Sequence, residues 1–156
     1  MHLFEPWVAL VGPLYVLVIS VPLIIFDVKQ RRLPNRLVLP GLPIAMLVQT
    51  IACVITQNFA PLGVALLWML GGFGFGLLFN RLGALGMGDA KLIALLCLNL
   101  GWFDPVWPLI SLVAAFFVAT VLVLLGFVFR RQSLSSSIPL GPYLLGGFAL
   151  VLTQLA

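Results

Sequence analysis

Long apolar runs divide the chain into six segments, which short polar or charged connections separate. The runs cover residues 7–26, 37–56, 61–79, 82–103, 106–129 and 138–155. Each is close to the roughly 20 residues that a helix needs to cross the hydrocarbon core of a bilayer. The runs are apolar on every side and lack the alternation of a membrane β-strand. The pattern therefore predicts an all-α, polytopic membrane protein with six transmembrane helices.

Composition supports this prediction and excludes an ordinary soluble domain. Of the 156 residues, 63% are hydrophobic and only 8% are charged, against about 25% charged residues in a typical soluble domain. Disordered chains and coiled coils need many more polar residues. Six crossings use roughly 120 residues, so we expect residues 1–156 to form a single domain with short connections.

The positive charges predict the orientation of the helices. All eight basic residues fall on one side of the six-helix arrangement: Lys29, Arg31, Arg32, Arg36, Arg81, Lys91, Arg130 and Arg131. By the positive-inside rule this side is cytoplasmic, which places both termini outside. Orientation and contact with anionic membrane lipid explain the basic residues 29–36, and no nucleic-acid partner is expected.

Small residues inside the runs are interpreted as packing residues. Cys53 and Cys97 lie within apolar runs, where a free cysteine acts as a small apolar side chain. Two cysteines cannot form a four-thiolate zinc site, and no metal or cofactor is expected. Gly72 and Gly76 form a small-xxx-small pair, for which packing inside the molecule is favoured over a dimer interface. The oligomeric state is left open.

Two of the four acidic residues, Asp27 and Asp89, lie at or just inside predicted spans on the cytoplasmic side. An ionisable group there is costly and by default functional. Asp27 could instead end its helix beside Lys29, and Asp89 could occupy a helix N-terminus. Because the topology brings both acids to one leaflet, a joint role is favoured.

Such a pair suits the hydrolysis of an amide by water. Two neighbouring carboxylic acids at the edge of a low-dielectric medium cannot easily both ionise, so one keeps its proton and the pair titrates as a unit. The ionised partner takes a proton from water, while the protonated partner polarises the carbonyl and later helps the amine to leave. No metal or covalent nucleophile is required.

The residues next to both acids fit this chemistry. Gly86 and Gly88 precede Asp89 and permit an irregular backbone and the close approach of another chain, so an extended peptide could lie there. Residues 33–35, Leu-Pro-Asn, are predicted to be extended before the proline and to form a turn. This turn would cap the connection and hold the second span against the first.

Three segments resemble those of the type IV prepilin peptidases, membrane aspartic proteases of the GxGD type. They are Asp27-Val-Lys-Gln-Arg-Arg-Leu-Pro-Asn35 with Leu39-Pro40, Gly86-Met-Gly-Asp-Ala-Lys-Leu92 with Leu100-Gly-Trp102, and Ile138-Pro-Leu-Gly-Pro-Tyr-Leu144. The Gly-x-Gly-Asp motif alone is a weak signal. Three blocks in the family's order, over residues 27–147, are specific.

The resemblance implies an endopeptidase of the bacterial inner membrane that removes the basic leader from prepilins or pseudopilins on the cytoplasmic side. Carried over by position, Asp27 and Asp89 are the catalytic pair, and Gly86 and Gly88 line the peptide path. The family motifs also include the following residues, for which support or positioning of the substrate is inferred: Lys91, Pro139 and Gly141. Larger members have an N-terminal region, often with two Cys-x-x-Cys pairs, and methylate the product. This sequence shows no such region, so methyltransferase activity is not expected and a stand-alone peptidase of tight-adherence or Flp-type pili is the nearer likeness.

Two alternatives stay open. A small transporter or channel could use Asp27 and Asp89 to bind a cation or relay protons, although both acids lie at one face and not near the midplane. An inactive relative would bind pilin-like helices without cutting them, although the motifs are intact. Ion flux in liposomes that is lost in Asp variants would favour transport.

Overall fold

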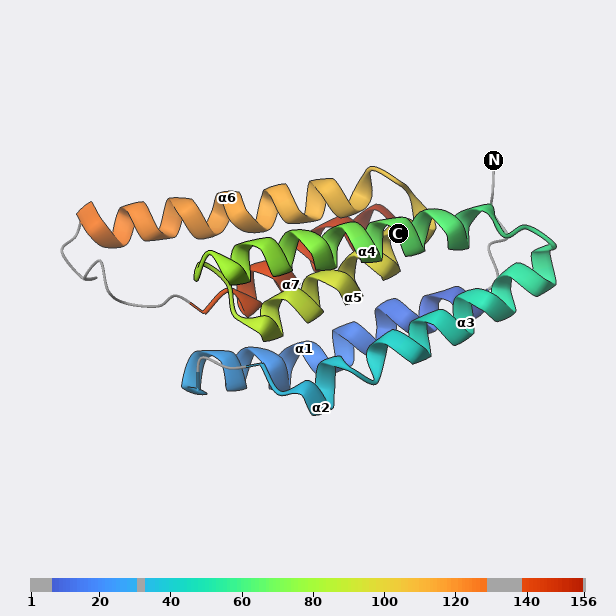
Figure 1. Ribbon diagram of the computed structural model, residues 1–156, viewed down its shortest axis with the longest axis horizontal. Coiled ribbons are helices and arrows are strands. Elements are labelled where there is room, and N and C mark those ends of the chain that lie inside the picture. The colour runs from blue at the N-terminus through green and yellow to red at the C-terminus, as the bar shows by residue number, and fades with distance from the viewer. Residues whose placement is uncertain (1–6, 31–32, 129–138, 156) are drawn as a thin grey trace.

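The computed structural model describes residues 7–30, 33–128 and 139–155. All elements in these ranges are helices: η1 (Trp7–Leu10), α1 (Val11–Gln30), α2 (Asn35–Val38), α3 (Gly41–Thr56), α4 (Ala60–Arg81), α5 (Met87–Phe103), α6 (Trp107–Val128), α7 (Gly141–Leu152) and η2 (Thr153–Leu155). The long helices run back and forth along one axis, with α6 along one edge, α1 and α3 along the other, and α4, α5 and α7 between them (Figure 1). The predicted all-α class is confirmed for the described part of the chain.

Within the described residues, four helical stretches are long and apolar enough to cross a membrane: residues 7–30, 35–56, 60–81 and 107–126. The other two predicted spans are shorter, because α5 has 17 residues and α7 has 12. At 1.5 Å per residue they are about 25 Å and about 18 Å long, against about 30 Å for the hydrocarbon core. The number of six crossings stays a prediction.

Two predicted boundaries differ from the structure near the acidic residues. The first span is predicted to end at Phe26, but α1 continues to Gln30, so Asp27 lies inside the helix. The fourth is predicted to begin at Leu82, but residues 82–86 are not α-helical and α5 begins at Met87. Gly83 in this turn has φ 74°, a left-handed conformation that glycine adopts at little steric cost.

The second predicted span consists of two helices, α2 and α3, with a turn at Leu39 and Pro40 between them. Pro40 is the N-cap of α3 and cannot donate a backbone hydrogen bond to the preceding turn. The hydroxyl of Tyr15 in α1 donates to the carbonyl of Leu37 in α2 at 2.8 Å. This bond ties the short helix α2 to α1.

The helix α5 is the centre of the bundle. Of its 17 residues, 12 are buried, and α1, α2, α3, α4, α6 and α7 all contact it. A helix that is apolar all round belongs in the interior. Cys97 of α5 and Cys53 of α3 are free and buried, which confirms their interpretation as packing residues.

The helix α4 approaches α5 closely at two glycines. A Cβ atom on Gly76 would lie 2.6 Å from the Cα atom of Ala90, and one on Gly72 would lie 2.7 Å from Sγ of Cys97. Both glycines are buried in this contact. The prediction that this pair packs inside the molecule is confirmed.

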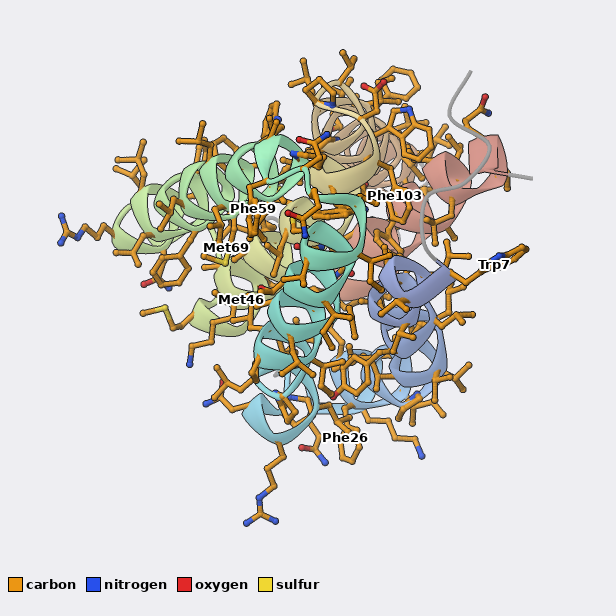
Figure 2. The ribbon with its side chains drawn as sticks, turned by 90° about the vertical axis from the view of Figure 1, so that its right-hand side faces the viewer. Trp7, Phe26, Met46, Phe59, Met69 and Phe103 are labelled. Carbon is orange, nitrogen blue, oxygen red and sulfur yellow. The ribbon has the colours of Figure 1, made fainter. Side chains whose placement is uncertain are left out.

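Large apolar side chains also cover the outside of the bundle. Trp7, with 81% of its surface exposed, projects away from the helices (Figure 2). It lies in η1, before the start of α1, whereas Phe26 is in the last turns of α1 and so at the other end of this long helix. In a monomeric soluble protein such surfaces mark interaction sites. The hydrocarbon of a bilayer satisfies them here.

The described basic residues gather at the Phe26 end. Lys29 is in the last turn of α1, Arg81 is in the last turn of α4, and Arg36 and Lys91 lie in α2 and at the start of α5. The other four basic residues fall outside the described residues: Arg31, Arg32, Arg130 and Arg131. The described charges agree with the predicted clustering at one end.

Candidate active site

A cavity of about 400 Å³ opens at the basic end of the bundle, and both aspartates line it. The lining residues come from the end of α1, the segment before and into α2, and the start of α5: Asp27, Leu33, Asn35, Gly86, Met87, Gly88, Asp89 and Lys91. Segments that are about 60 residues apart in the sequence therefore form one site. The cavity lies at the ends of these helices.

The carboxylate of Asp27 is held by another helix. Asp27 lies near the end of α1 on the buried face, and only 4% of its surface is exposed. Its Oδ2 atom accepts the backbone N–H of Gly141 at 2.8 Å. Gly141 is the first residue of α7, where backbone N–H groups have no partner within the helix. The first N–H group of α7 thus provides a hydrogen-bond donor for the buried carboxylate of α1.

The carboxylate of Asp89 is held by its own segment. Asp89 is the third residue of α5, and its Oδ2 atom accepts the backbone N–H of Gly86, the N-cap, at 3.1 Å. This is the acidic half of a capping box, and glycine has no side chain for the other half. The bond fixes the direction of Asp89 at the cavity wall, where the side chain stays half-buried.

The turn before α5 is built by backbone hydrogen bonds at the end of α4. The N–H groups of Ala84 and Leu85 donate to the carbonyl of Phe79 at 2.9 and 3.3 Å. The side chain of Asn80 donates to the carbonyl of Leu85 at 2.8 Å. These bonds close the turn around Gly83 and bring Gly86 to the start of α5.

Gly88 lets the two halves of the site meet. A Cβ atom on Gly88 would lie 2.9 Å from Cβ of Leu33 and 3.3 Å from its carbonyl oxygen. The segment after Asp27 therefore packs directly on the helix that carries Asp89. The predicted close approach at Gly88 therefore involves the protein's own chain, and both Gly86 and Gly88 line the cavity.

Lys91 and Asn35 form a second link across the cavity. The Nζ atom of Lys91 donates to Oδ1 of Asn35 at 3.0 Å. Asn35 begins α2 after the extended residue Pro34, and no side-chain cap is present at this helix start. The predicted turn forms, because the N–H groups of Leu37 and Val38 donate to the carbonyl of Pro34 at 3.0 and 3.4 Å. The side-chain hydrogen bond that joins α2 to α1 comes from Tyr15.

The structure separates the residues that sequence reasoning grouped as substrate-binding. Gly86, Gly88 and Lys91 line the cavity, whereas Pro139 and Gly141 are not among its lining residues. Gly141 is next to Asp27 instead: a Cβ atom there would lie 2.8 Å from Oδ2. Sequence reasoning missed this contact because it joins residues 114 positions apart. It also missed Leu33, Asn35 and Met87 as lining residues, although the two motifs contain all three.

The charged groups among the described lining residues of the cavity are two acids and one base. Among its described lining residues, the titratable side chains are Asp27, Asp89 and Lys91. Within the part of the chain that the structure describes, no three His, Cys, Asp or Glu side chains gather to hold a metal ion. Both carboxyl groups therefore lie at the wall of one cavity.

A comparison with protein-family models places the chain in a known family. Residues 14–124 match the model of the type IV leader peptidase family. The chain belongs to this family. The matched range holds both aspartates and ends before Gly141, so the contact of α7 with Asp27 is a finding of the structure alone. Comparisons with curated proteins and with solved structures gave no match.

Membership in the leader peptidase family agrees with the apolar helices, and the chain is a membrane-embedded peptidase in general terms. The family's segment around Asp27 and its segment around Asp89 form the walls of one cavity. A peptidase needs such a place, where a peptide bond can reach the reacting groups.

Proposed function

We propose that the protein is an aspartic endopeptidase that removes the basic leader peptide from type IV prepilin-like or pseudopilin proteins at the cytoplasmic edge of the bacterial inner membrane. The observation that carries this proposal is the cavity lined by both Asp27 and Asp89. Family membership supports the leader peptidase activity, and the basic residues at this end of the bundle support the cytoplasmic side.

The geometry suits a mechanism in which water attacks the peptide bond directly. One carboxylate takes a proton from water while the water oxygen bonds to the carbonyl carbon, and the other carboxyl group gives its proton to the carbonyl oxygen. The neutral diol then collapses. The first carboxyl group passes its proton to the amine nitrogen as the C–N bond breaks, and the second recovers a proton from a diol hydroxyl. Both groups return to their starting states.

The position of the cavity suits a substrate with an apolar membrane helix and a basic leader. The helix of the substrate would lie in the bilayer, and its leader would extend into the aqueous phase at the same height as Asp27 and Asp89. Gly86, which is exposed, leaves the backbone before α5 accessible for an extended peptide, whereas Gly88 is in contact with Leu33. Lys91 and Asn35 line the same cavity.

The test uses purified protein in detergent or liposomes with candidate prepilins from the same cell. Asp27→Asn and Asp89→Asn each replace the titratable carboxyl group with an amide of nearly the same size. The cleavage rate of each variant is therefore expected to fall by at least about a hundredfold. Asp104→Asn is the matched control, since Asp104 lies in the connection between α5 and α6 and accepts the N–H of Val106. Mass spectrometry of the product N-terminus identifies the cut bond and any methylation.

Full activity in Asp27→Asn or in Asp89→Asn would show that the substituted residue is not part of the catalytic pair. Circular dichroism and size-exclusion chromatography should show the same fold for all three variants. Ion flux through liposomes that depends on Asp27 and Asp89 without any cleavage of prepilins would contradict the peptidase proposal.

A further inference from the structure

We propose that Gly141 is a positioning residue of the catalytic centre, through which α7 holds Asp27 in the ionised form that acts as the base. This inference rests on the proposed peptidase function and assigns separate roles to the two aspartates. Asp89 then carries the proton that polarises the substrate carbonyl.

The first argument is the hydrogen bond. The N–H of Gly141 donates to Oδ2 of Asp27 at 2.8 Å, and it belongs to the first turn of a 12-residue helix. A carboxylate is stabilised by backbone N–H donors and by the positive end of the helix dipole. The donor of Asp89 is the N–H of Gly86, three residues earlier in the same segment, at 3.1 Å. Among the hydrogen bonds of the described residues, Asp27 is the one of the pair that is bound by a separate helix.

The second argument is the space around the carboxylate. Asp27 is almost fully buried, with 4% of its surface exposed, and an unpaired buried carboxylate would instead take up a proton. A Cβ atom at position 141 would lie 2.8 Å from Oδ2 and 3.3 Å from Cγ of Asp27. Only glycine lets the backbone of α7 come this close. The backbone N–H of Gly141 could therefore both stabilise the charge of the Asp27 carboxylate and fix the position of that carboxylate.

The surroundings allow the two aspartates to differ. The titratable side chains that share the cavity with Asp27 are Asp89 and Lys91 of α5, among the described lining residues. Lys91 is engaged by Asn35. The segment of α2 that lines the cavity adds no charge there, and α7 contributes a backbone donor. The ionised form of Asp27 therefore depends on Gly141 more than on a cationic side chain in the cavity wall.

Two substitutions at Gly141 test the proposal in the full-length protein. Gly141→Ala places a methyl group against the carboxylate. Replacement of Gly141 by glycolic acid, which turns the amide into an ester, removes the N–H donor and adds no volume. Gly146→Ala is the control, since Gly146 lies in the same helix and has no neighbouring atom within 4 Å of an added Cβ.

The readouts are kcat, KM and the pH profile of prepilin cleavage. For both variants we expect kcat to fall roughly ten- to a hundredfold with KM nearly unchanged, and the acidic limb of the profile to move to higher pH, because the ionised form of Asp27 has lost its donor. Gly146→Ala should match the wild type. A merely structural role would lower the melting temperature without moving the pH limb.

The outcomes separate this inference from the proposed function. If the wild type cleaves prepilin and the folded ester variant keeps its kcat and its pH profile, the role of Gly141 is overturned while the peptidase stands. The ester variant decides the case also where Gly141→Ala does not fold. If the wild type does not cleave any prepilin, the proposed function fails and this inference fails with it.

Discussion

At the scale of single residues, the site depends on backbone atoms as much as on side chains. Both carboxylates accept backbone N–H groups, and Gly88 and Gly141 lie where a Cβ atom would touch the other half of the site. The two aspartates could be selected from the sequence as site residues, because an ionisable side chain at a membrane span is costly and by default functional. The glycines before Asp89 could be selected because they permit an irregular backbone. The partners of these residues could not be predicted.

The contact at Gly88 leads to a specific expectation. In Gly88→Ala the new Cβ would lie 2.9 Å from Cβ of Leu33, so the segment that leads into α2 should move away from α5. A shift of about 1 Å in groups that position the substrate can cost up to about a hundredfold in rate. If the protein cleaves prepilins as proposed, we expect kcat/KM to fall roughly ten- to a hundredfold. Gly63→Ala, whose Cβ would meet no atom within 4 Å, should leave kcat/KM unchanged. Wild-type kinetics in Gly88→Ala would show that Leu33 can yield at no cost.

At the scale of helices, the hydrophobic pattern located the segments well and their ends poorly. The run at 82–103 reads as one span because apolar residues continue through the turn at residues 82–86. The left-handed backbone of Gly83 and the hydrogen bonds to Phe79 end α4 there, and neither has a hydropathy signal. The pattern likewise ends the first span at Phe26, where the apolar run stops, whereas α1 continues through the buried Asp27 to Gln30.

The contact between α4 and α5 gives a prediction on stability. In Gly76→Ala the added Cβ would lie 2.6 Å from the Cα atom of Ala90, and overpacking of this kind costs about 1–3 kcal/mol. Gly74→Ala lies two residues earlier, has no atom within 4 Å of its Cβ, and should be neutral or stabilising by up to about 1 kcal/mol, because alanine favours the helix over glycine. Denaturation in detergent measures both. Equal stability of the two variants would mean that α4 can move away from α5 freely.

At the scale of the whole molecule, the central position of α5 is the feature that the sequence could not show. Its apolar run is no more hydrophobic than its neighbours, yet six other helices surround it. Hydropathy indicates which side chains avoid water. In a membrane protein an apolar side chain can contact either lipid or other helices, so hydropathy does not tell which helix is buried inside the bundle. The alternating direction of successive long helices, by contrast, follows from the short connections between them.

The six-span topology gives the last prediction, because α5 and α7 are the two helices whose crossing is in question. If α5 crosses the membrane, its two flanking turns lie on opposite sides. Ala84 and Pro105 are exposed in these turns, and Gln154 is exposed after α7. With single cysteines at these positions, a membrane-impermeant maleimide should label positions 105 and 154 in intact spheroplasts, and position 84 only after permeabilisation. The parent protein should stay unlabelled, since Cys53 and Cys97 are buried. Equal labelling of positions 84 and 105 in intact spheroplasts would show that α5 does not cross, and the cytoplasmic placement of Asp89 would then fail as well.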